Sequence, residues 1–223
     1  MATVQAPAEQ RLVLWDVGWK GYLALLDVVG DRRIRITYDR GNVELMTVSP
    51  LHEFSKKNLA RLIEILSYEL DLDIRSGGSF TFKREDLDRG LEPDECYWFR
   101  NEPLVRMKME FDPLIDPPPD LVVEVEVSRS VLDRMGILAA LGVPEIWRFD
   151  ESAILVQHLQ PDGSYAIRPA SLSFPWLPMA EMTERVRRVG KMSERELIRS
   201  FVAWVREEIA PRIRPGADNV GRP

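Results

Sequence analysis

The segment that most constrains the fold is PDLVVEVEVSRS, residues 119–130. Its run of valines predicts a strand in the centre of a sheet, yet the strand carries Glu124 and Glu126. Strand side chains alternate between faces, so the two glutamates share a face with Val122, about 7 Å apart along the strand. Two half-buried carboxylates repel and cost desolvation free energy unless they are neutralised. A bound divalent cation and arginine partners are the two ways to neutralise them.

The rest of the chain predicts helices and strands in alternation. Helical spacing of apolar residues predicts a helix over 19–28, and Ser49-Pro50 starts a longer one that reaches about residue 70. Between them, DRRIRITYDRGNVELMTVS predicts a β-hairpin. Further strands are predicted on both sides of Gly77-Gly78, over 95–99, over 121–127 and in 143–169, with helices again from about 178.

The strand over 121–127 is followed by a helix, with Ser128 or Ser130 as its expected N-cap and Gly142 as its C-terminal stop. The next strand, EIWRFD, completes a parallel strand–helix–strand crossover. The fold class is therefore α/β (α+β), a mixed sheet flanked by helices with an N-terminal hairpin and C-terminal helices. We expect a single domain over 11–210, a flexible N-terminus over 1–10 and a flexible tail over 211–223.

Composition narrows the functional classes. The single cysteine, Cys96, excludes an internal disulfide and favours the cytoplasm, where thiols stay reduced. Two histidines and one cysteine do not make a structural zinc site, so a metal here would have oxygen ligands and would be Mg²⁺, Mn²⁺ or Ca²⁺. The N-terminus has no signal-peptide pattern, and no apolar run reaches membrane-spanning length. The net charge of −6 argues against non-specific nucleic-acid binding but leaves a local basic patch open.

A third carboxylate lies in EPDECYW, where Asp94 follows Pro93 at the start of a strand. Pro-Asp is also a common turn dipeptide, so a plain turn residue is the alternative reading. If that strand pairs with 121–127, Asp94 lies beside Glu124. Carboxylates on adjacent strands commonly hold Mg²⁺ for phosphodiester hydrolysis.

These segments resemble a known family. GLEPDECYW, PDLVVEVEVSRS and GVPEIWRFD, together with YDRGNVELMTVSPLHE and FKREDLDRG, look like the restriction endonuclease family long catalogued as a domain of unknown function. That family belongs to the PD-(D/E)xK nuclease superfamily. The resemblance covers roughly residues 15–190, and the combination of segments is specific, although the bare three-letter pattern is weak.

The resemblance implies that Asp94 and Glu124 are metal ligands for Mg²⁺ or Mn²⁺. The motif lysine is absent, because Glu126 occupies its position. Related families carry this lysine on the following helix, where Arg134 is the nearest basic residue, and Lys83 is a further candidate from a neighbouring strand. Glu126 is either a third metal ligand or the mark of altered or lost catalysis.

Other residues have both functional and ordinary explanations. His52 matches a histidine often seen in the family, or is a helix-start residue; Glu44 lines the same cleft or pairs with an arginine. Arg32, Arg33 and Arg35 form a phosphate-binding patch or an exposed hairpin face. Cys96, His158 and Trp147 are expected to be structural.

The resulting hypothesis is a Mg²⁺-dependent endonuclease acting on DNA, with a homodimer as a possible assembly. One alternative is a catalytically degenerate nuclease fold that acts as a DNA-binding or regulatory module. A basic side chain within reach of the two carboxylates would argue against this alternative. The other is a structural or oligomeric protein, which predicts Glu124 and Glu126 in salt bridges with no cavity beside them.

Overall fold

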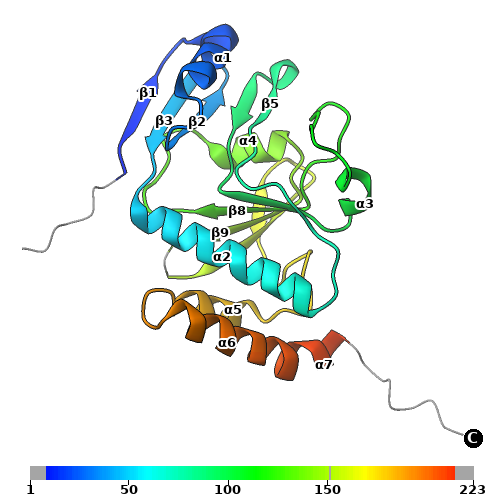
Figure 1. Cartoon of the computed structure of the whole chain (residues 1–223). Helices are drawn as coiled ribbons and strands as arrows, with labels where there is room; N and C mark the ends of the chain where they lie inside the picture. Colours follow the sequence, from blue (N-terminus) through cyan, green and yellow to red (C-terminus); the bar gives the residue numbers. More distant parts are fainter. Residues whose placement is uncertain (1–8, 151, 214–223) are drawn as a thin grey trace, which may run out of the picture.

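The computed structural model describes residues 9–150 and 152–213, whose strands form two sheets (Figure 1). The antiparallel five-stranded sheet has the order β1-β3-β2-β6-β5, and the six-stranded sheet the order β11-β10-β9-β8-β7-β4. The first sheet comprises β1 (Arg11–Leu14), β2 (Ile34–Asp39), β3 (Asn42–Thr47), β5 (Phe82–Arg84) and β6 (Arg89–Leu91). The second comprises β4 (Arg75–Ser76), β7 (Glu95–Trp98), β8 (Leu121–Val125), β9 (Glu145–Phe149), β10 (Ile154–Leu159) and β11 (Tyr165–Ile167).

The helices of the described residues fall between and after these strands. They are α1 (Gly18–Val29), α2 (Pro50–Glu69), the 3₁₀ turn η1 (Glu85–Leu87), α3 (Glu102–Val105), α4 (Arg134–Ala140), α5 (Met179–Val186), α6 (Glu194–Trp204), the π-helical turn η2 (Val205–Ile209) and α7 (Ala210–Ile213). The predicted mixed sheet flanked by helices is confirmed, because β8 and β9 pair in parallel while the other pairs of the six-stranded sheet are antiparallel.

Both faces of the six-stranded sheet are buried. On one face Leu121, Val123 and Val125 of β8 pack against a core that includes residues of α2, α5 and α6. These three helices lie on the same side of β8 and β9 (Figure 1). On the other face Val122 packs with Ile137 and residues of β5 and β7. Because strand side chains alternate, Glu124 shares the face of Val122, the face that α4 covers.

The connection from β8 to α4 differs from the sequence prediction. The strand ends at Val125, and α4 begins only at Arg134, with Asp133 as its N-cap in place of Ser128 or Ser130. The Asp133 carboxylate accepts a hydrogen bond from the Gly136 N–H at 2.9 Å. The two serines instead donate hydrogen bonds to carboxylates distant in the sequence, Ser128 to Glu9 and Ser130 to Glu44. The predicted stop at Gly142 is confirmed: its φ is 79°, and the Val143 N–H returns to the Leu138 carbonyl.

The chain ends fall partly outside the described residues. Of the flexible N-terminus predicted for 1–10, residues 1–8 lie outside them, whereas Glu9 and Gln10 are described and hydrogen-bonded. Of the tail predicted for 211–223, residues 214–223 lie outside and 211–213 belong to α7. The domain limits stay predictions. In the described part of the chain, no helix combines the length and apolarity that a membrane crossing requires.

Candidate active site

Asp94 and Glu124 lie side by side, as the sequence predicted if the two strands paired. β7 runs antiparallel to β8 with Glu95 opposite Val123, so Asp94, one residue before β7, faces Glu124. Asp94 Oδ2 accepts a hydrogen bond of 2.7 Å from the Val125 N–H. Both acids are buried, at 3% and 7% exposure. Buried carboxylates on adjacent strands require compensating positive charge.

Arg134, the first residue of α4, supplies part of that charge. Its guanidinium binds both carboxylate oxygens of Glu124, at 2.7 and 2.9 Å from Nη2. It also donates to Thr37 Oγ1 at 2.6 Å and to the Glu92 carbonyl at 2.9 Å. Arg134 therefore ties β8 to the five-stranded sheet, and a basic group lies within reach of the two carboxylates.

Glu126 and Lys83, the other predicted site residues, lie differently. Glu126 follows the end of β8, lines the cavity described below and forms an ion pair with Arg148 at 3.4 Å. Lys83 is not brought to the site: it is exposed on β5, in the five-stranded sheet, opposite Gly90. That prediction failed because β5 pairs with β6 rather than with the strands that carry the acids.

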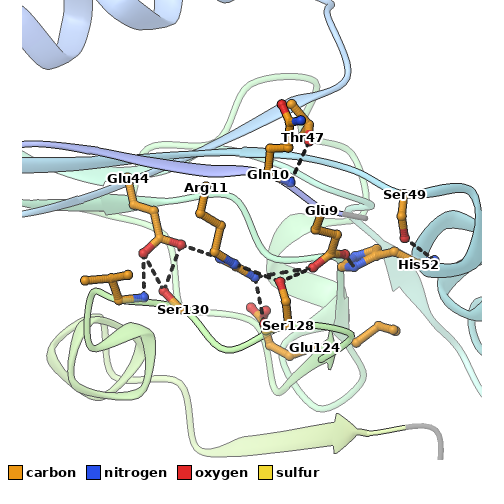
Figure 2. A network of polar contacts seen from close by, with 12 residues as sticks. Glu9, Gln10, Arg11, Glu44, Thr47, Ser49, His52, Glu124, Ser128 and Ser130 are labelled. Atoms are coloured by element: carbon orange, nitrogen blue, oxygen red, sulfur yellow. Dashed lines mark hydrogen bonds and ion pairs between the residues drawn. The ribbon is translucent and has the colours of Figure 1, made fainter. Parts of the chain in front are cut away.

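His52 joins the acidic pair from the first turn of α2. It is 2% exposed, and Ser49 caps its helix by accepting from the His52 N–H. The ring Nε2 lies 2.7 Å from Asp94 Oδ1. On the other side of the ring, Nδ1 lies 2.8 Å from Glu9 Oε1 (Figure 2). A carboxylate can only accept, so both ring nitrogens donate when both acids are ionised. His52 is thus part of the site and not a surface residue.

A second polar cluster surrounds Glu44 on β3 (Figure 2). The carboxylate of Glu44 pairs with Arg11 and accepts from Ser130 Oγ, from the Val131 N–H at 2.7 Å and from the Leu132 N–H at 3.0 Å. The predicted arginine partner for Glu44 is therefore present. The cluster fixes residues 130–132, just ahead of Arg134.

The pKa values of the two central acids, Asp94 and Glu124, are shifted in opposite directions. Burial raises the pKa of Glu124, and the neighbouring charge of Asp94 adds to this, so the pKa lies above its ordinary value despite Arg134. Burial acts in the same sense on Asp94, but the hydrogen bond and charge of His52 hold its pKa below its usual range. Although burial acts to lower the pKa of His52, hydrogen bonds to Asp94 and Glu9 raise it to about 9. At neutral pH His52 is therefore an imidazolium.

A cavity of about 390 Å³ opens beside these residues. Its walls carry both acids, His52 and several arginines. The arginines are Arg11, Arg35, Arg129, Arg134 and Arg148. A cavity that concentrates guanidinium groups around two carboxylates suits an anionic ligand such as a phosphodiester.

The three arginines predicted as a patch on the hairpin do not lie together in the structure. Arg35 lines the cavity and forms ion pairs of 3.7 Å with Glu92 and 3.8 Å with Glu53. Arg32 instead donates to the last carbonyls of α1, and Arg33 is exposed. One arginine of the three thus belongs to the site. Cys96 and Trp147 are fully buried core residues, as expected.

For Glu9, Ser128 and Ser130, nothing in the sequence pointed to a place in the site. Glu9 lies in a stretch that composition assigns to a loose terminus, and Ser128 and Ser130 are read as helix caps. Ser128 Oγ donates to Glu9 and accepts from Arg11 Nε at 2.9 Å, contacts that span 119 and 117 residues. Only the charge pattern of Arg11 and Glu44, which lie on paired strands, offered a local clue.

The number of ligating side chains grouped together limits how a metal ion could be bound. Within 9–150 and 152–213, no three His, Cys, Asp or Glu side chains are grouped so that they could hold a metal ion. Mg²⁺ does not need three, because it is commonly bound by one or two carboxylates with waters and substrate phosphates. Asp94 and Glu124 meet that requirement, provided that Glu124 shares an oxygen with Arg134.

Antiparallel β7 and β8 with facing acids, a parallel crossover to β9 and a basic residue at the start of α4 agree with the arrangement that the resemblance to the PD-(D/E)xK class implies. The family model Uma2, described as "putative restriction endonuclease", matches residues 19–187, and the chain belongs to this family. No curated protein matches the chain.

Proposed function

We propose that this protein is a metal-dependent endonuclease that hydrolyses phosphodiester bonds in DNA. The observation that carries the proposal is the buried pair Asp94 and Glu124 on adjacent strands, facing an arginine-lined cavity, with Arg134 bound to Glu124. Family membership supports nuclease chemistry in general. The metal, the DNA substrate and the residue roles below belong to the proposal.

Asp94 and Glu124 would hold Mg²⁺ or Mn²⁺, which polarises the phosphate and lowers the pKa of an attacking water. The side chains around the two acids would interact with the negatively charged substrate. Arg134 stabilises negative charge on the reacting phosphate but does not transfer protons, because a guanidinium stays protonated. Glu126, at the motif lysine position, holds Arg148 beside the cavity.

One observation favours the second candidate, a DNA-binding module without catalysis. Both oxygens of Glu124 are already engaged by Arg134, which neutralises the carboxylate without a metal. The purely structural alternative is less favoured. It predicted the salt bridges of Glu124 and Glu126, which exist, but it also predicted no cavity beside them, and there is one.

The first experiment is calorimetric titration of Mn²⁺ and Mg²⁺ into the wild type and Glu124→Gln, with and without a DNA duplex. We expect saturable binding that is lost in the variant. The matched control is Glu102→Gln, a buried glutamate on α3 that pairs with Arg106 away from the cavity. Absence of cation binding in the wild type, with and without DNA, would favour the non-catalytic module.

Arg134 gives a second test. Arg134→Ala should reduce the rate of DNA cleavage by about 100-fold, because it removes a positioned positive charge from the reacting phosphate. Arg134→Lys restores a charge and a titratable amine, so we expect a smaller loss. The measurement is cleavage of labelled DNA under single-turnover conditions. Equal rates in Arg134→Ala and the wild type would exclude a catalytic role for this arginine.

The compartment and the assembly are further parts of the proposal. A single, buried cysteine is consistent with the reducing cytoplasm. A homodimer would give two copies of the site, one for each strand of a duplex. Sedimentation velocity of the purified chain at several concentrations measures the assembly state, and a monomer throughout would remove the homodimer.

A further inference from the structure

Glu9 lies ten residues before the region that the family match covers, yet it enters the site. Its position is set by backbone pairing. The Gln10 N–H donates to Thr47 Oγ1 at 2.9 Å, and the Thr47 N–H returns to the Gln10 carbonyl at 2.9 Å. β1 then continues along β3 from Arg11 opposite Met46. This pairing directs the Glu9 side chain inward, toward His52 at the start of α2 (Figure 2).

The Glu9 carboxylate is completely buried, with 0% of the side chain exposed. Each oxygen has a partner: Oε1 meets His52 Nδ1 at 2.8 Å, and Oε2 accepts from Ser128 Oγ. The Arg11 guanidinium lies 3.6 Å from Oε2. Burying a carboxylate is costly, and it is tolerated where hydrogen bonds and an opposite charge compensate. Glu9 is therefore a built part of the interior and not a surface acid that happens to be near.

His52 is held from two sides. Glu9 engages Nδ1 and Asp94 engages Nε2, so the ring bridges the N-terminal segment and the strand pair of the site. With Asp94 alone, the ring could rotate or turn a bare nitrogen toward the carboxylate. With Glu9 present, the Nδ1–H bond fixes the ring plane, and Nε2 keeps its hydrogen toward Asp94. Asp94 Oδ2 is fixed independently by the Val125 N–H.

We propose that Glu9 is a positioning residue of this site: it orients His52 so that the ring holds Asp94 in place beside Glu124. This inference rests on the proposed function for its catalytic meaning, but the orientation of His52 can be measured without any activity. Glu9 acts through His52 and is not among the residues that line the cavity.

The test is nuclear magnetic resonance of the His52 ring in protein labelled with ¹⁵N-histidine. The chain has two histidines, so His158→Gln leaves His52 as the single reporter. His158 lies on β10, away from the cavity. In this background we expect a slowly exchanging Nδ1–H signal at neutral pH. Glu9→Ala should remove the signal by exposing the proton to exchange with water.

Two further variants separate positioning from general damage. Glu9→Gln keeps a hydrogen-bond acceptor but no charge, so the Nδ1–H signal should persist and move upfield, because charge-assisted hydrogen bonds are the stronger ones. The matched control is Glu53→Gln, the residue next to His52, whose side chain is 41% exposed and points to Arg35. It should leave the His52 signals unchanged.

An Nδ1–H signal that is absent in the wild type, or identical in Glu9→Ala, Glu9→Gln and the wild type, would overturn the proposal. If DNA cleavage is present, Glu9→Ala should lower kcat by about 10-fold with little change in KM, the lower end of the range for outer-shell residues, because Glu9 acts on the proposed metal ligand Asp94 only through His52. If the wild type does not cleave DNA, the proposed function fails while the ring measurement still decides the role of Glu9.

Discussion

At the scale of single residues, the site is a set of buried charges that each have a partner. Glu44 is the clearest example, with its carboxylate held by Arg11 and by two backbone N–H groups. Burial acts to raise its pKa, but these hydrogen bonds and the Arg11 charge hold the pKa below its ordinary value. The ionised form is therefore stabilised by folding, and protonation must weaken the fold.

This linkage predicts a pH dependence. A depressed folded-state pKa contributes stability that is present above the unfolded pKa and is lost as the pH falls through the folded value. Glu44→Gln should therefore lower Tm at pH 7, and the gap to the wild type should narrow below about pH 4.5, the ordinary glutamate range. Thermal melts between pH 7 and pH 3.5 measure this. A gap that stays constant across the range would mean that the Glu44 charge does not contribute.

At the scale of elements, the connection between β8 and α4 decides where Arg134 lies. The loop over 126–133 is fixed at both sides, through Ser128 to Glu9 and Arg11 and through Ser130 to Glu44. α4 then covers the face of β8 that carries Glu124 and ends at a left-handed Gly142. The helix is short, at seven residues, so its two ends strongly influence its position.

Gly142 provides the test at this scale. Its φ of 79° is costly for alanine, so Gly142→Ala should destabilise the fold by about 1 kcal/mol. The nearest side-chain atom to an added Cβ would be Pro118 Cγ at 3.8 Å, an ordinary contact, so the cost is in the backbone. Gly142→Asn should lose less, because asparagine tolerates this conformation. Denaturant unfolding of both variants compares them, and equal losses would point to packing instead.

Local patterns in the sequence predicted these elements well, and their contacts less well. The valine run of β8, the helix start at Ser49-Pro50 and the Gly142 stop are encoded within a few residues. The pairing of Asp94 with Glu124 needed only the assumption that neighbouring strands pair. Lys83 was misplaced because sequence does not say which sheet a three-residue strand joins. Glu9 was missed because its partners lie 43 and 119 residues away.

At the scale of the whole molecule, the cavity lies where the two sheets meet. Of the residues that line it, Thr37 and Met46 come from the five-stranded sheet. Glu124 belongs to β8 of the other sheet, and Asp94 directly precedes its β7. The net charge of −6 is unfavourable for DNA, so the proposed DNA binding requires attraction from a local set of arginines around the cavity. Arg129 is the exposed member of that set.

This arrangement predicts a salt dependence. Arg129→Ala should weaken DNA binding at all sequences and reduce the slope of log affinity against log salt by about 1, as expected for the loss of one phosphate contact. The control is Arg168→Ala, an exposed arginine just after β11 and outside the cavity lining. Fluorescence anisotropy with labelled DNA over a salt series gives both slopes. Equal slopes in all three proteins would place the binding surface elsewhere.

The long-range contacts of Glu9 and Glu44 also bear on the order in which parts of the structure form during folding. The β2–β3 hairpin closes over two residues, whereas the bonds from Glu9 to Ser128 and from Glu44 to Leu132 close loops of 119 and 88 residues. Loop closure costs more entropy as the loop lengthens, and contacts between distant residues slow folding. We therefore expect the scaffold to form first and the polar interior last, which pulse-labelling hydrogen exchange at the Leu132 N–H would time. A newly made chain would then acquire its shape before it acquires the means to act on a substrate.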